Sequence, residues 1–189
     1  MSQKVIAKII DQNGIRRTIV RLAHEIIERN KGTERLAIVG VRTRGAFLAK
    51  RLINEINKIE GDELHLGVLD ITMYRDDFRQ RLRQPKVQQT NIPFDIDEKN
   101  IVLVDDVIYT GRTTRAALEA LMSFGRPANI QLAVLVDRGH RELPIKPDYV
   151  GKNIITSIGE EIRVKMKEVD NDDCVLLVEA PERKSEFSD

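Results

Sequence analysis

Two adjacent carboxylates follow an apolar run in the segment IVLVDDVIYTGRT, at residues 101–113. The apolar residues 101–104 predict a strand that is buried on both faces, as in a parallel sheet. Asp105 and Asp106 then lie at the carboxyl end of this strand, where parallel sheets bind their ligands. Because ionised carboxylates accept hydrogen bonds from hydroxyl groups, the pair can bind the two vicinal hydroxyls of a sugar.

A turn of small and hydroxyl-bearing residues follows the carboxylates and opens a predicted helix. Its N–H and hydroxyl groups can surround an anion, and the helix points the positive end of its dipole at the same place. The residues of this phosphate loop are Thr110, Gly111, Arg112, Thr113 and Thr114. A carboxylate pair beside a phosphate loop suits a ribose 5-phosphate. The alternative, a strand ending in a solvated acidic turn, leaves the coincidence of strand, acid pair and turn unexplained.

A second anion-binding turn is predicted between an apolar strand and a helix. It combines two guanidinium groups with a helix N-terminus, so it can clamp a pyrophosphate. Its residues are Arg42, Thr43, Arg44 and Gly45. Taken alone, this turn is interpreted equally well as a basic surface connection.

Alternating strands and helices are predicted around these turns, which indicates an α/β fold with a mostly parallel central sheet. Strands are predicted at residues 4–10, 35–41, 64–72, 101–104, 130–136, 162–168 and 174–179, the last two as a pair. Helices are predicted at residues 15–30, 45–58 and 113–124. Asp11 or Asn13 can cap the first helix, and residues 137–160 are predicted to be rich in turns.

The composition fits one domain over residues 1–180, followed by an acidic, frayed tail at 181–189. Aromatic residues make up 4% of the chain and Trp is absent, which argues against base stacking as the main binding device. Cys174 is the single cysteine, so no intrachain disulfide can form. Neither a signal peptide nor an apolar run of membrane-spanning length is recognised. We therefore expect a cytoplasmic protein with no membrane partner.

The carboxylate pair and phosphate loop together resemble the phosphoribosyl pyrophosphate (PRPP) motif of type I phosphoribosyltransferases. The resemblance implies that Asp105 and Asp106 bind the ribose hydroxyls, that residues 110–114 hold the 5-phosphate, and that residues 42–45 bind pyrophosphate. It also implies Mg²⁺ held through PRPP rather than by a dedicated protein site. The implied fold adds a small hood, mainly within residues 137–165, to a mostly parallel sheet flanked by helices.

A flexible lid at residues 73–92 is also implied by the resemblance. Its residues Tyr74, Arg75, Asp76 and Asp77 would close over the site and exclude water. The polar segment has no apolar period, so a disordered surface loop is the alternative.

The residue at position 109 bears on which base is used. Purine phosphoribosyltransferases usually carry an Asp directly before the Thr-Gly pair, whereas this chain has Tyr109. The difference argues against a purine substrate and leaves no obvious general base. In the hood, the resemblance places Asp137 and Arg138 near a pyrimidine.

Four segments make the resemblance more specific, namely residues 15–32, 70–78, 104–118 and 131–153. They are similar to the bifunctional pyrimidine operon regulators and uracil phosphoribosyltransferases of bacteria. By that resemblance the protein converts uracil and PRPP to UMP and pyrophosphate. It would also bind pyr-operon leader mRNA when UMP or UTP is bound, promoting transcription termination. A homodimer that can assemble into a higher oligomer is implied as well.

Basic residues that can contact RNA occur on one helix face and near the hood. Arg17, Arg21 and His24 share a face because offsets of four and seven residues return near the same angle. The others are Arg138, Arg141, Lys146 and Lys152. Basic residues opposite an apolar stripe are common on any surface helix, so the resemblance, not the charge pattern, carries the expectation of RNA binding.

Two alternatives stay open. The first is a regulator that keeps the PRPP fold only to sense nucleotides, although a UMP sensor needs no pyrophosphate loop. The second is a salvage enzyme for another base with no RNA role.

Overall fold

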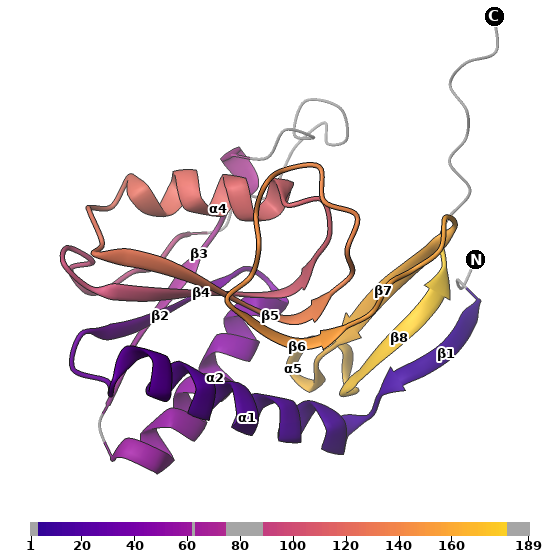
Figure 1. The fold of residues 1–189 in the computed structure, drawn as a ribbon, viewed down its shortest axis with the longest axis horizontal. Coiled ribbons are helices and arrows are strands. Elements are labelled where there is room, and N and C mark those ends of the chain that lie inside the picture. The colour runs from indigo at the N-terminus through magenta and orange to yellow at the C-terminus, as the bar shows by residue number, and fades with distance from the viewer. Residues whose placement is uncertain (1–3, 62, 75–88, 181–189) are drawn as a thin grey trace, which may run out of the picture.

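A five-stranded parallel sheet forms the centre of the molecule (Figure 1). The computed structural model describes residues 4–61, 63–74 and 89–180. The strand order is β3-β2-β4-β5-β6, and every neighbouring pair runs parallel. The strands are β2 (Leu36–Val41), β3 (His65–Leu69), β4 (Asn100–Ile108), β5 (Asn129–Asp137) and β6 (Tyr149–Asn153). The predicted α/β fold with a mostly parallel central sheet is confirmed.

Helices cover both faces of this sheet (Figure 1). Helices α1 (Gln12–Asn30) and α2 (Arg44–Glu60) lie on one face, and α4 (Arg112–Met122) lies on the other. Successive side chains of the buried strands point to opposite faces of the sheet. In β4, for example, Val102 packs into the cluster under α1 and α2, and Leu103 packs under α4. This burial on both faces explains why the strand reads as an uninterrupted apolar run.

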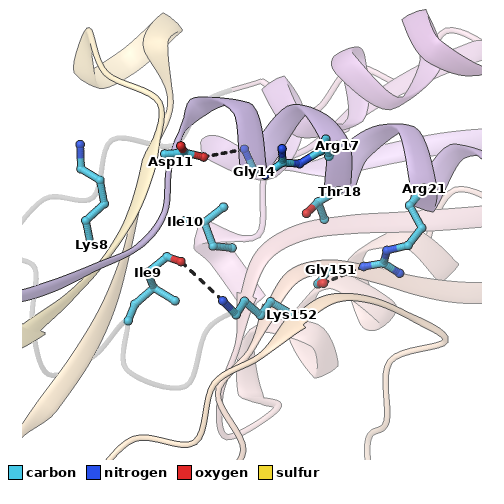
Figure 2. Close-up of a pocket in the computed structure, with 10 residues that line it drawn as sticks. All are labelled: Lys8, Ile9, Ile10, Asp11, Gly14, Arg17, Thr18, Arg21, Gly151 and Lys152. Atoms are coloured by element: carbon cyan, nitrogen blue, oxygen red, sulfur yellow. Dashed lines mark hydrogen bonds between the residues drawn. The ribbon is translucent and has the colours of Figure 1, made fainter.

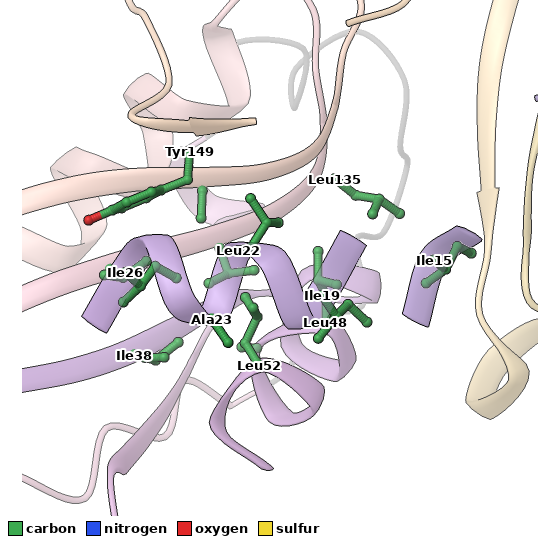
Figure 3. Close-up of a cluster of buried hydrophobic side chains, with 14 of the residues drawn as sticks. Ile15, Ile19, Leu22, Ala23, Ile26, Ile38, Leu48, Leu52, Leu135 and Tyr149 are labelled. Atoms are coloured by element: carbon green, nitrogen blue, oxygen red, sulfur yellow. The ribbon is translucent and has the colours of Figure 1, made fainter. Parts of the chain in front are cut away.

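The first helix packs its predicted apolar stripe into the larger cluster (Figure 3). The stripe of Ile15, Ile19, Leu22 and Ile26 is buried, as predicted. It meets α2 and the sheet at Leu48, Leu52, Leu135 and Tyr149. Asp11 caps the helix as predicted, because its Oδ1 accepts a hydrogen bond from the Gly14 N–H at 2.7 Å.

A second, three-stranded antiparallel sheet lies beyond the carboxyl ends of the central strands (Figure 1). Its order is β1-β8-β7, with β1 (Val5–Ile10), β7 (Glu160–Lys165) and β8 (Cys174–Glu179). The predicted pairing of the last two strands is confirmed. The short helix α5 (Lys167–Asp170) connects them. We call this sheet and α5 the hood.

The hood does not follow the range that the resemblance implied. Within residues 137–165, β6 belongs to the central sheet and β7 alone belongs to the hood. The other two hood strands come from the two ends of the described chain, at 5–10 and 174–179. The expected range was therefore too narrow, because antiparallel pairing joined segments that are far apart in sequence.

Strand β6 was not predicted. The turn-rich interpretation of residues 137–160 is wrong over 149–153, because this strand is short and has one buried apolar side chain, Tyr149. A Cβ on Gly151 would lie 2.4 Å from the Leu135 oxygen and 2.7 Å from Thr18 Cγ2. The missing side chain lets β6 fit between β5 and α1, which is a tertiary reason that a local pattern does not contain.

No helix within residues 4–61, 63–74 and 89–180 combines the length and apolar character needed to span a bilayer.

Candidate active site at the carboxyl end of the parallel sheet

The acid pair lies at the end of the central strand β4. Asp105 is buried, with 8% of its surface exposed. Its Oδ1 accepts a hydrogen bond from the Asp106 N–H at 2.9 Å, and Asp106 Oδ1 accepts one from the Val107 N–H at 2.9 Å. Burial raises the pKa of Asp106, against the lowering effects of a hydrogen bond with Asp105 and of the Arg44 charge. Both carboxylates are thus fixed by the main chain in a largely dry environment.

The predicted phosphate loop connects this strand to α4. Gly111 has φ 92° at the N-cap, a conformation that glycine adopts without the steric penalty of a side chain. Thr114 is buried in the first turn, whereas Arg112 is exposed and its Nε donates to Glu142 Oε2 at 2.7 Å. Gly111 at the N-cap has no side chain to cap the helix, and the Arg112 N–H donates to Thr110 Oγ1 of the turn at 3.4 Å. The loop therefore has the geometry of an anion site at a helix N-terminus.

The predicted pyrophosphate loop lies directly beside the acid pair. It connects β2 to α2, and its Arg42–Thr43 peptide is cis. A Cβ on Gly45 would lie 2.5 Å from the Val104 oxygen and 3.1 Å from Asp105 Cα. The start of α2 therefore packs on the backbone of β4, and the structure brings the two sequence-distant turns together at one edge of the sheet.

The two arginines of this loop have different partners. Arg42 Nη2 donates to the Gln89 oxygen at 2.9 Å. Arg44 forms a bidentate pair with Asp170 of α5, with Nε–Oδ2 at 3.1 Å and Nη2–Oδ1 at 2.7 Å. The Arg44 charge also acts on Asp106. Arg44 is therefore held between the acid pair and the hood.

Sequence reasoning did not select Asp170 as a site residue. It lies 126 residues from Arg44 along the chain, and neither residue belongs to a motif that includes the other. The charge of residues 168–173 was visible, but nothing in the pattern indicated its partner.

The expected lid lies mostly outside the described residues, including Arg75, Asp76 and Asp77. Tyr74 ends a short 3-10 helix, η1 (Thr72–Tyr74). Its backbone carbonyl oxygen accepts a hydrogen bond from Arg115 Nη2 at 3.4 Å. Arg115 belongs to α4, which follows the phosphate loop. The segment that leads into the expected lid is thus attached to the phosphate-loop helix.

The residues expected to recognise the base lie beside Tyr109. The Arg138 guanidinium lies 4.0 Å from the centre of the Tyr109 ring, and its Nε donates to Thr156 Oγ1 at 2.8 Å. Asp137 Oδ1 accepts a hydrogen bond from the Gly139 N–H at 2.8 Å. Tyr109, where purine enzymes carry an Asp, therefore packs against an arginine at the edge of the site.

Arg141 joins the end of β5 to Tyr109, the residue that precedes the phosphate loop. Its guanidinium donates to Asp137 Oδ2 at 2.6 Å, to the backbone carbonyl oxygen of Tyr109 at 2.8 Å and to the backbone carbonyl oxygen of Ile145 at 3.0 Å. The side chain is 22% exposed. Sequence analysis had placed Arg141 among the RNA-binding residues, but its donors are directed inward. These contacts indicate a structural role for Arg141 at the site, and its contact with RNA stays a prediction.

Comparison with known proteins decides the family. The phosphoribosyl transferase domain family matches residues 6–168. The bifunctional protein PyrR of Pelotomaculum thermopropionicum is 57% identical, over 93% of this chain and 97% of that protein. PyrR of Deinococcus radiodurans is 57% identical, over 90% of this chain and 93% of that protein. PyrR of Listeria monocytogenes is 54% identical, over 94% of this chain and 98% of that protein. The chain belongs to the PyrR family of phosphoribosyltransferases. The resemblance drawn from four sequence segments is confirmed.

Solved structures show the same fold at low identity to this PyrR-family chain. A hypoxanthine-guanine phosphoribosyltransferase from Bacillus anthracis matches with a TM-score of 0.69 and 19% identity, over 94% of this chain and 99% of that one. The hypoxanthine phosphoribosyltransferase of Trypanosoma cruzi matches with a TM-score of 0.69 and 16% identity, over 95% of this chain and 98% of that one. At such identities the likeness establishes the type I phosphoribosyltransferase fold and nothing about the base.

A basic groove lies apart from this site in the PyrR-family chain (Figure 2). Lys8 of β1, Arg17 and Arg21 of α1, and Lys152 of β6 line a cavity of about 580 Å³. Arg21 Nη2 donates to the Gly151 oxygen at 2.7 Å, and Lys152 Nζ lies 3.5 Å from the Ile9 oxygen. The cavity lies where α1, β1 and β6 meet, so it borders both the central sheet and the hood.

The groove brings together part of the expected RNA-binding set. Arg17, Arg21 and Lys152 line it, and Lys8, which sequence analysis did not select, joins them. His24 and Lys146 are exposed but do not line it, and Arg138 is directed to Tyr109.

Proposed function

We propose that this protein transfers the 5-phosphoribosyl group of PRPP to uracil, releasing UMP and pyrophosphate. We propose that it also binds pyr-operon leader mRNA when UMP or UTP is bound, and thereby promotes transcription termination. Family membership supports both activities. The observation that carries the enzymatic half is the position of the Asp105 and Asp106 carboxylates between two anion-binding turns.

Different residues of the site bind different parts of PRPP. The acid pair accepts hydrogen bonds from the ribose hydroxyls, and the first turn of α4 binds the 5-phosphate. The pyrophosphate lies at the N-terminus of α2, where Arg44 donates to it. This arrangement holds the ribose at both ends and leaves C1 accessible to the base.

The reaction breaks the bond between C1 and the pyrophosphate oxygen and forms a bond between C1 and uracil N1. The transition state resembles an oxocarbenium ion, and the leaving electron pair goes to pyrophosphate. Arg44 and the α2 dipole stabilise the negative charge that develops there. Uracil loses its N1 proton to water before it attacks as the anion, or to the departed pyrophosphate after the leaving group has left, so neither a covalent nucleophile nor a dedicated general base is required.

Mg²⁺ is the cofactor that this chemistry calls for. Held together with PRPP beside Asp105 and Asp106, it would neutralise the charge of the leaving group. The oxygen ligands that the Asp105 and Asp106 carboxylates offer at this edge suit a hard cation.

The first experiment measures pyrophosphate release from PRPP and Mg²⁺ with uracil, hypoxanthine and orotate in parallel. We expect turnover with uracil alone. Turnover with hypoxanthine would instead indicate a purine enzyme, despite Tyr109. No turnover with any base, together with UMP-dependent RNA binding, would indicate a nucleotide-sensing regulator.

The basic groove is the surface that we propose for RNA. Its four cations come from three elements and line one cavity, which suits the phosphates of a folded RNA. Arg17→Ala and Lys152→Ala should each weaken binding of the leader mRNA. Each should also reduce the slope of log affinity against log salt concentration by about the amount expected for one phosphate contact. Arg16→Ala is the matched control, because this neighbouring arginine of α1 does not line the groove.

The RNA experiment also separates the alternatives. Wild-type binding that is insensitive to salt and to UMP would favour the salvage enzyme with no RNA role. Equal losses in Arg17→Ala and Arg16→Ala would show that general charge, and not the groove, binds the RNA. Uracil turnover should be unchanged in all three variants.

We also propose a cytoplasmic homodimer that can assemble into a higher oligomer. A dimer axis would place two basic grooves on one assembly, which would extend the surface available to RNA. Light scattering coupled to size-exclusion chromatography measures the assembled mass, and a monomer at all concentrations would contradict this part of the proposal.

A further inference from the structure

Two arginines of α2 bind three carboxylates in the segment 168–173, which comprises part of α5 and the turn that follows it in the hood. Arg44 pairs with Asp170, and Arg51 pairs with Glu168 and with Asp173, each at 2.7 Å. We call these five residues the α2–α5 clasp. The clasp attaches the segment around α5 to the helix that begins at the pyrophosphate loop.

The two halves of the clasp differ in where they hold α2. Arg44 is the first residue of the helix and belongs to the pyrophosphate loop. Arg51 lies two turns further along, about 10 Å from the start of the helix. Both arginines make charged pairs with the same hood segment, but only Arg44 stands beside the acid pair, where its charge acts on Asp106.

The carboxylate of Asp170 is itself held in place. Its side chain is 19% exposed, and its Oδ2 also accepts a hydrogen bond from the Met166 N–H at 2.9 Å. The Arg44 guanidinium holds the pKa of Asp170 below its usual range, so the carboxylate is ionised at neutral pH. A fixed anion of this kind can determine the orientation of the arginine that it binds.

The geometry of the pair leaves part of Arg44 for a ligand. The bidentate contact uses Nε and Nη2 of the guanidinium. Nη1 carries two further N–H groups on another edge of the same plane, outside this pair. Because the guanidinium is planar, fixing one edge also fixes the direction of the remaining N–H groups.

We propose that Asp170 is a positioning residue for the pyrophosphate loop. Its carboxylate holds the Arg44 guanidinium in the orientation that donates to the pyrophosphate of PRPP. An arginine on a flexible side chain would otherwise lose conformational entropy when the ligand binds, and the fixed pair removes part of that cost in advance. This inference rests on the proposed function of the site.

The test compares Asp170→Asn with Asp173→Asn in the full-length protein. Immobilising one such side chain corresponds to a factor of about threefold to tenfold in affinity. Asp170→Asn should raise the KM for PRPP by that factor, with kcat and the KM for uracil changed less than about twofold. Asp173→Asn removes a similar charge from the same clasp and should leave the KM for PRPP unchanged.

A double-mutant cycle shows whether Asp170 acts through Arg44. In the Arg44→Ala background, Asp170→Asn should cause no further loss of PRPP affinity. A further loss of similar size would overturn the inference, because Asp170 would then act by another route.

Three other outcomes would overturn the inference. An unchanged KM for PRPP in Asp170→Asn would show that the orientation of Arg44 does not matter. A lower KM would show that Asp170 competes with the ligand for Arg44. Equal rises in Asp170→Asn and Asp173→Asn would show that the clasp only holds the hood on α2.

Calorimetric titration of the same variants with PRPP and Mg²⁺ separates this inference from the proposed function. If the wild type binds PRPP but does not turn over uracil, the proposed activity fails and the calorimetric affinities still decide the role of Asp170. If the wild type does not bind PRPP, both are overturned. Unfolding temperatures of the variants identify any that are not folded.

Discussion

Asp106 occupies a position where burial and ligand binding favour opposite protonation states. Burial raises its pKa, which means that ionisation costs folding free energy. For such a group, the contribution to stability is fully present below the unfolded pKa and is lost as the pH rises through the folded pKa. Ribose hydroxyls donate to the ionised form, so PRPP should lower the pKa of Asp106 again.

A pH dependence of PRPP affinity follows at this residue. We expect binding to weaken as the pH falls through the raised pKa of Asp106, above the range of an ordinary aspartate. Asp106→Asn should lower PRPP affinity by about tenfold or more, because hydrogen bonds to a charged group contribute about 1.5–3 kcal/mol. Calorimetry over a pH series measures both effects.

The Asp106→Asn variant should also lose the pH dependence and keep its RNA affinity largely intact. An equal loss of PRPP and RNA binding would argue against separate sites for the two ligands.

Arg141 provides a second prediction for a single residue. Its side chain donates to the Asp137 carboxylate and to the backbone carbonyl oxygen of Tyr109. Arg141→Ala therefore leaves partly buried acceptors unsatisfied at the edge of the site. We expect a loss of about 1–3 kcal/mol in the free energy of unfolding and a reduced uracil turnover. Urea unfolding and steady-state kinetics measure the two effects, with Lys146→Ala as an exposed control. Full turnover and unchanged stability in Arg141→Ala would contradict the structural role and leave RNA contact as the prediction for this residue.

At the scale of elements, the α2–α5 clasp joins the hood to the central domain by charge. The Arg51 pair is partly buried, with 22% of the Arg51 side chain and 8% of the Asp173 side chain exposed. Arg51 lowers the pKa of Glu168 by hydrogen bonding, and it lowers the pKa of Asp173 despite the opposing effect of burial. Both carboxylates therefore favour the folded state when ionised.

The clasp should weaken in acid. A lowered folded-state pKa contributes stability that is present above the unfolded pKa and is lost as the pH falls through the folded value. Arg51→Ala should therefore destabilise the protein by about 1–3 kcal/mol at pH 7 and by progressively less below pH 4. Thermal unfolding of wild type and variant over this pH range measures the difference. A constant difference at all pH values would assign the effect to packing of the Arg51 side chain.

Elements also explain where sequence prediction worked. The strand before Asp105 and the stripe of α1 were predicted because their periodicity matches the burial that they experience. Strand β6 was missed because its place depends on Gly151 fitting against Thr18 and Leu135. The hood strands β1 and β8 were expected individually, but not that they pair with each other.

At the scale of the whole molecule, the proposed nucleotide site lies where the central sheet and the hood meet. A ligand bound there contacts segments from both parts, so it should stabilise the whole fold. UMP at 100 times its Kd should raise the free energy of unfolding by about 2.7 kcal/mol. Chemical unfolding with and without UMP measures this gain, and IMP at the same concentration should give less. Equal stabilisation by UMP and IMP would contradict the preference for a pyrimidine.

The sequence alone determined the parts whose chemistry is local. The acid pair, the two anion-binding turns and the helical stripe of α1 are each contained in a short segment, so residue type and spacing predict them. The family resemblance was sufficiently specific for the same reason, because its motifs are contiguous segments.

Tertiary structure decided which of these parts meet. Arg44 faces Asp170, Lys8 joins Arg17 and Lys152, and Arg141 is directed inward. Each of these contacts joins segments that are distant in sequence, or depends on the path of the backbone around one side chain. Charge and hydrophobic pattern predict that a side chain is polar and exposed or apolar and buried. They do not predict its partner, because the partner depends on how the strands and helices pack.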